Sequence, residues 1–96
     1  MDVIRIPEDL VRVFKTVFPD TIRSYDLIES KRVYEYYRVK VFLFTTPFSK
    51  LQTSVNLVKR LLSDNNMKYV KCTLHPYSAT TLLLEFLVGV RKTGHA

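Results

Sequence analysis

Residues 32–44 decide the fold of this chain, and they read RVYEYYRVKVFLF. Valine, tyrosine and phenylalanine dominate the stretch, and all three favour β-strands. Successive side chains of a strand point to opposite faces of its sheet. One face holds Val33, Tyr37, Val39, Val41 and Leu43, and the other holds Tyr34, Tyr36, Arg38 and Lys40, before Phe42 and Phe44 make both faces apolar. The stretch therefore predicts a long strand with one buried face and one face that mixes aromatic and basic groups.

An amphipathic helix is predicted on each side of this strand. Over residues 7–18 the apolar positions recur with helical spacing, and Pro7 and Pro19 bound the pattern. The second helix begins either at a Thr46 cap before Pro47 or at a capping box that Ser49 forms with Gln52. Its apolar stripe consists of Leu51, Val55, Val58 and Leu62, and residues 64–66 (Asp-Asn-Asn) end it.

Further strands are predicted over residues 21–29, 67–75 and 79–92, and a short one is indicated over residues 3–6. In the last two long strands the apolar side holds Val70, Cys72, Leu74, Leu82, Leu84, Phe86, Val88 and Val90. A three-residue loop between these strands keeps both faces consistent. It pairs Cys72 with Leu82, Lys71 with Leu83 and Tyr69 with Glu85.

The resulting order is (β)αββαββ in one α+β domain over residues 1–96. It contains a ferredoxin-like βαββαβ core with an antiparallel or mixed sheet and two helices on one face. Without the strand over residues 3–6 the order is αββαββ, with the same face covered by helices.

Length and charge fit a single small basic domain. The 96 residues include 15 Lys and Arg against 9 Asp and Glu, which gives a net charge of +6. Most of this excess lies after residue 48. A positive charge favours acidic partners through long-range electrostatics, so nucleic acid is one candidate partner.

The sequence offers little for catalysis or cofactor binding. It has only two glycines, Gly89 and Gly94, so it cannot form a phosphate-binding loop or a dinucleotide fingerprint. The single cysteine, Cys72, and two histidines do not form a zinc set, and His75 lacks a partner at a catalytic spacing. We therefore predict a protein that is not an enzyme and holds no cofactor or metal. No signal peptide or membrane span is predicted either.

The face away from the helices is the predicted binding surface. Its candidate partner-binding residues are Tyr34, Tyr36, Arg38, Lys40, Tyr69 and Lys71, and its candidate homodimer residues are Leu83 and Leu87. Tyrosine with lysine or arginine suits nucleic acid, a protein partner or a second copy of the chain, and the remaining interpretation is an ordinary solvated face. The glycine-containing motif of RNA-recognition domains is missing from residues 38–44.

Three stretches resemble one family of proteins. They are residues 39–48 (VKVFLFTTPF), the helical residues 58–62 (VKRLL), and the final hairpin over residues 70–74 (VKCTL) and 82–86 (LLLEF). The chain resembles a small α+β family from crenarchaeal rod-shaped viruses, some members of which are anti-CRISPR proteins. The likeness spans most of residues 33–92.

The resemblance implies a viral protein that acts in the host cytoplasm. Its implied partner is a host defence protein, the large subunit of a type I-D interference complex, and its implied mechanism is stoichiometric inhibition by a homodimer. It assigns no role to individual residues. The alternative from charge alone is a basic nucleic-acid-binding module or viral regulator.

Overall fold

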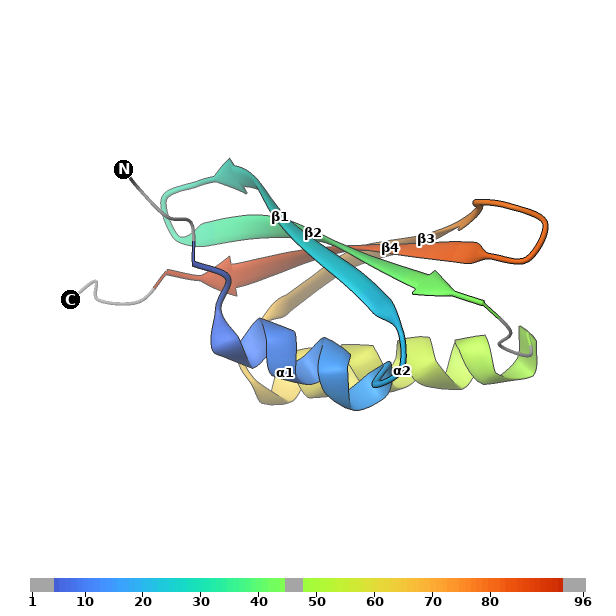
Figure 1. Ribbon diagram of the computed structural model, residues 1–96. Helices are drawn as coiled ribbons and strands as arrows, with labels where there is room; N and C mark the ends of the chain where they lie inside the picture. The colour runs from blue at the N-terminus through green and yellow to red at the C-terminus, as the bar shows by residue number, and fades with distance from the viewer. Residues whose placement is uncertain (1–4, 45–47, 93–96) are drawn as a thin grey trace.

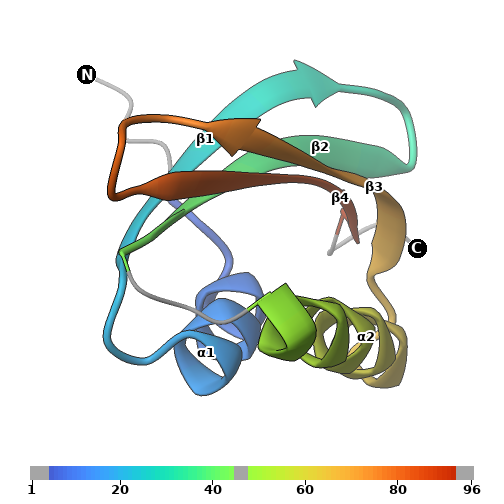
Figure 2. The same ribbon diagram turned by 90° about the vertical axis from the view of Figure 1, so that its right-hand side faces the viewer.

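The computed structural model describes residues 5–44 and 48–92, and it shows a four-stranded antiparallel sheet with two helices (Figure 1). Along the chain the elements are α1 (Glu8–Val17), β1 (Ile22–Ser30), β2 (Tyr34–Leu43), α2 (Phe48–Asp64), β3 (Lys68–Pro76) and β4 (Leu82–Arg91). The strands lie in the order β1-β2-β4-β3. Figure 2 shows both helices on one side of the sheet. The predicted α+β class and the shared helix-covered face are confirmed.

The strand indicated over residues 3–6 does not precede α1 in the described part of the chain. Val3 and Ile4 lie outside the described residues, and Arg5 and Ile6 belong to neither a helix nor a strand. The remaining predicted elements are all present. Val33, predicted on the buried face, lies instead in the β1–β2 turn and is exposed.

The helix ends follow their sequence signals with one exception. Pro7 directly precedes α1, and acidic residues occupy the first turn of that helix. Helix α2 begins at Phe48, so Ser49 lies inside the helix and the capping box predicted there is wrong; Thr46 lies outside the described residues. At the other end Asn66 has a φ of 59° and Met67 N–H donates to the Leu62 carbonyl at 2.8 Å. This left-handed residue and backbone bond close the helix as a Schellman motif.

The core lies between the sheet and the helices. Phe86 of β4 is fully buried and packs edge-on against Phe14 of α1, with ring centroids 5.0 Å apart. Tyr37, Val39, Val41 and Leu43 of β2 are also buried, while their neighbours on the strand are partly exposed. The alternation predicted for residues 34–43 is therefore confirmed.

The predicted pairing of β3 with β4 is wrong by four residues. Pro76 pairs with Leu82, and residues 77–81 form the loop, in which Tyr77 N–H donates to the Thr81 carbonyl at 3.0 Å. Pro76 can continue β3 because this is an edge strand, where a missing N–H can face away from the sheet. Cys72 consequently lies opposite Phe86 rather than Leu82. Because side chains alternate along a strand, a shift by an even number of residues leaves each one on its predicted side of the sheet. Cys72 therefore stays on the helix side and Lys71 on the opposite side.

At the start of β3, a β-bulge reverses the side of the sheet toward which the residues before it point. The register shifts between Tyr69 and Lys71, with Val70 as the extra residue. Tyr69 therefore lies opposite Val88, on the helix side of the sheet, and packs against the core. Its predicted place among the partner-binding residues on the other face is wrong, because a bulge cannot be recognised from simple alternation.

Candidate functional site

We call the side of the sheet away from the helices the outer face. Because cross-strand partners lie on the same face, the register defines its members. The predicted site residues Tyr34, Tyr36, Arg38, Lys40, Lys71, Leu83 and Leu87 all lie there. No described helix covers this face (Figure 2).

An apolar row crosses one end of the outer face. Ile22 of β1 pairs with Phe42 of β2, and Phe42 pairs with Leu83 of β4. On β3 the residue opposite Leu83 is His75, and the ring of Tyr77, in the β3–β4 loop, meets Phe42 edge-on at a centroid distance of 5.1 Å. Ile22 and Tyr77 are 61% and 65% exposed. We call Ile22, Phe42, Leu83 and Tyr77 the apolar row; it gives the outer face a hydrophobic contact surface.

Charges of opposite sign meet in the middle of the outer face. Arg38 Nε lies 3.1 Å from a carboxylate oxygen of Glu85, and Arg38 also pairs in register with Asp26. Lys40 is the cross-strand partner of Glu85. The basic side chains predicted to bind a partner are thus partly compensated here, and this region is less positive than the sequence alone indicates.

Aromatic and basic groups gather at the opposite end from the apolar row. The rings of Tyr34 and Tyr36 have centroids 6.1 Å apart, and Lys68 Nζ lies 5.8 Å from the Tyr34 ring centroid. These side chains lie close to Gly89, where an added Cβ would come within 3.0 Å of Tyr36 Cε1 and 3.3 Å of Lys68 Cβ. Arg91 pairs with Tyr34 in register. We call Tyr34, Tyr36, Lys68 and Arg91 the tyrosine end.

Tyr69 and Cys72 belong to a separate cluster between β3 and α2. Lys59 of α2 places its Nζ 5.0 Å from the Tyr69 ring centroid. Burial raises the pKa of Cys72 to about 11, against a smaller lowering effect of Lys59. A thiol with this pKa is protonated at neutral pH and is a poor nucleophile, which agrees with the predicted place of Cys72 on the apolar side of its strand.

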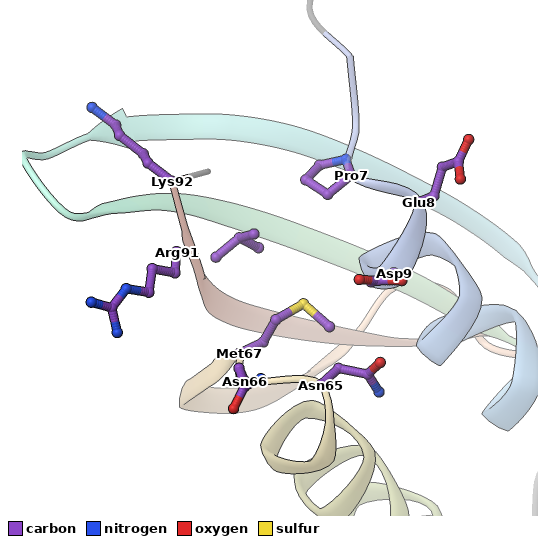
Figure 3. A pocket seen from close by; sticks show the side chains of 9 residues that line it. Pro7, Glu8, Asp9, Asn65, Asn66, Met67, Arg91 and Lys92 are labelled. Atoms are coloured by element: carbon purple, nitrogen blue, oxygen red, sulfur yellow. The ribbon is translucent and has the colours of Figure 1, made fainter. Parts of the chain in front are cut away.

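A hollow of about 540 Å³ lies where α1 begins and α2 ends (Figure 3). Pro7, Asp9, Asn65 and Met67 line it together with the charged residues Glu8, Arg91 and Lys92. In Figure 3 the side chains of Glu8, Arg91 and Lys92 point away from the centre of the hollow. The polar groups do not converge on one point, as they would in a site built to hold a small ligand.

Both edges of the sheet carry features that discourage strand addition. Edge strand β1 has a bulge between Leu27 and Glu29, and edge strand β3 has one between Tyr69 and Lys71. Bulges and charged side chains on edge strands oppose pairing with another chain. The outer face, rather than an edge, is therefore the surface best suited to a partner.

The prediction missed part of the apolar row. Ile22 and Tyr77 were not among the candidate site residues, and Phe42 was noted only as an apolar interruption of the polar alternation. That interruption was a usable signal, because an apolar residue on an otherwise polar strand face indicates a contact. Tyr77 lies in a loop, where alternation predicts nothing.

The fold and the outer face define a small α+β protein with one side of its sheet uncovered by the described helices. No family model matches the sequence, and no curated protein matches it. A solved structure has a similar fold: the type 4 fimbrial biogenesis protein PilO from Pseudomonas aeruginosa, with a TM-score of 0.59 and 14% identity over 94% of this chain and 71% of that one. At this identity the likeness concerns the fold alone. Neither helix in the described residues is long and apolar enough to cross a membrane.

Proposed function

We propose that this chain is a non-enzymatic viral protein that inhibits a host defence protein by binding it through the apolar row. The observation that carries the proposal is the row itself, in which exposed Ile22 and Tyr77 accompany the half-buried side chains of Phe42 and Leu83 on the outer face. A few well-packed residues, among which tyrosine is enriched, supply most of the binding energy in protein interfaces. The Arg38–Glu85 pair beside the row supplies a polar rim.

The host partner is proposed from the family resemblance of residues 39–48, 58–62, 70–74 and 82–86. It is the large subunit of a type I-D interference complex, bound in the host cytoplasm. A binding mechanism of this kind requires no catalytic group and no cofactor. It predicts inhibition in proportion to the amount of the chain, without turnover.

We also propose that the sheet is a circular permutation of the ferredoxin-like arrangement. The unit β2–α2–β3 is a split βαβ, because β2 and β3 are both antiparallel to the intervening β4. Strands β4 and β1 flank β2 in the same way. If β4 stood before α1 in the chain, β4, α1 and β1 would form a second split βαβ unit around β2. Strand β4 therefore takes the place of the strand that a ferredoxin-like order requires before α1.

The test of the proposed function is complex formation between the purified chain and the purified large subunit, followed by gel filtration. Ile22→Ser removes an exposed member of the apolar row, and Leu57→Ser is the matched control on α2, where Leu57 is 39% exposed. The proposal predicts co-elution of the wild type and of Leu57→Ser, and loss of co-elution for Ile22→Ser. Failure of the wild type to co-elute contradicts the proposed partner, and equal behaviour of the two variants contradicts the proposed surface.

The homodimer contact through Leu83 and Leu87 stays a prediction. Both leucines are half-buried on the outer face, but Leu83 belongs to the apolar row whereas Leu87 pairs with Arg38 and Lys71. Sedimentation equilibrium of the free chain and of a Leu83→Ser variant measures whether this contact forms.

A further inference from the structure

The tyrosine end borders a hollow of about 660 Å³ that is open to solvent. Tyr34, Ser63, Asn66, Met67, Lys68 and Arg91 line it, so it joins the outer face to the end of α2. Among the described residues, none that lines this hollow is acidic. It combines an aromatic ring with two cations, a hydroxyl and an amide.

The charges of this region are not neutralised by the ion pairs of the structure. The ion pairs between described residues involve Arg12, Lys31 and Arg38, and neither Lys68 nor Arg91 takes part in one of them. The middle of the outer face differs, because Arg38 there forms an ion pair with Glu85. Glu29, the register partner of Tyr36, is itself paired with Lys31, and Glu8 and Asp9 line the neighbouring hollow with Arg91 without forming an ion pair with it. Lys68 and Arg91 are therefore available to attract an anion.

Gly89 shapes the aromatic part of this region. With no side chain at position 89, Tyr34 and Tyr36 approach the backbone of β4, as the short distances from a Cβ built there show. The two rings are tilted by 37° to each other. The sheet therefore presents two neighbouring aromatic rings beside two cations.

We propose that the tyrosine end binds single-stranded nucleic acid, at a site distinct from the apolar row. A nucleotide carries a flat base next to a phosphate, and this pairing matches an aromatic ring next to Lys68 and Arg91. Stacking on aromatic side chains combined with phosphate neutralisation is the general way in which proteins hold single strands without reading their sequence. An acidic peptide complements the cations equally well, but it makes no use of the paired rings.

The test is fluorescence anisotropy of a short labelled oligodeoxythymidine with the full chain at low salt. Replacing Tyr34 by alanine should weaken binding roughly tenfold, the loss expected for one stacked base, whereas Tyr34→Phe keeps the ring and should bind like the wild type. The double variant Lys68→Ala/Arg91→Ala should lower the slope of log affinity against log salt by about 1.4, which is two single-strand phosphate contacts. The charge-matched control is Lys15→Ala/Lys50→Ala, which removes two exposed lysines of the helices.

Three results would overturn the proposal. One is the absence of binding by the wild type at low salt, and another is an equal loss of affinity in the control double variant, which would show that only net charge matters. The third is displacement of the oligonucleotide by oligoglutamate together with unchanged binding of Tyr34→Ala, which would indicate a site for acidic peptides. Ile22→Ser should leave oligonucleotide binding unchanged, so failure of this site and failure of the apolar row are distinguishable.

Discussion

Tyr25→Phe should stabilise the protein, because the hydroxyl of Tyr25 is costly where it lies. Tyr25 faces the helices from β1, opposite Val39, and its ring meets Phe14 edge-on at a centroid distance of 6.4 Å. The hydroxyl oxygen is buried and has no hydrogen-bond partner among the described residues. A buried polar group without a partner costs about 1–3 kcal/mol, and phenylalanine removes that group while it keeps the ring contact.

We expect the free energy of unfolding to rise by about 1 kcal/mol in Tyr25→Phe, which corresponds to an increase in Tm of roughly 4–8 °C for a domain of this size. Circular dichroism during thermal and urea unfolding measures both quantities. Tyr77→Phe is the control, because the Tyr77 side chain is largely exposed and its hydroxyl can reach water. A lower Tm for Tyr25→Phe would show instead that the Tyr25 hydroxyl makes a stabilising hydrogen bond. Partner binding should not change, because Tyr25 is absent from the outer face.

Three further predictions concern Cys72 and Gly89. With a pKa of about 11, the Cys72 thiol should react with a disulfide reagent at pH 8 roughly 100-fold more slowly in the folded protein than in guanidinium; equal rates would contradict its burial. The same raised pKa means that the stability contributed by Cys72 is lost as the pH rises from about 9 through 11, which Cys72→Ala should abolish in urea titrations. Gly89→Ala should cost about 1 kcal/mol, because its Cβ would crowd Tyr36 and Lys68, and unchanged stability in urea would show that these side chains move aside freely.

The sequence predicted the parts of the fold that depend on periodicity. The strand over residues 34–43 and helix α2 both have apolar residues at regular spacing. Both elements are present in the structure, and the face that carries these apolar residues is buried in each. The end of α2 was also predictable, because Asn66 tolerates the left-handed backbone that it adopts. These features are local, and a single window of sequence contains them.

Features that depend on a neighbouring strand could not be predicted in the same way. The bulge that turns Tyr69 toward Lys59 breaks the alternation, but it leaves no mark in the composition of residues 67–75. The β3–β4 register depended on whether Pro76 ends the strand, and only its edge position allows it to continue. The strand indicated over residues 3–6 rested on alternation over only four residues, and Arg5 and Ile6, the two of them that the structure describes, belong to no strand.

The sequence predicted that the candidate site residues share one face of the sheet, but not that this face has an apolar end and a tyrosine end. Alternation placed Tyr34, Arg38 and Lys71 together correctly. The separation of the apolar row from the tyrosine end appears only when the register aligns Ile22 with Phe42 and Leu83, and Gly89 with Tyr36. Net charge alone could not show that Arg38 is bonded to Glu85.

Isothermal titration calorimetry with the large subunit of the type I-D complex measures the proposed contact itself. We expect Phe42→Ser to weaken binding by about 30-fold or more, the effect of losing an interface hot spot, and Leu57→Ser on α2 to bind like the wild type. Both variants replace an apolar side chain by serine, and thermal unfolding of each confirms that it is folded. Equal affinities for Phe42→Ser and the wild type would contradict the claim that the apolar row of the outer face holds the partner.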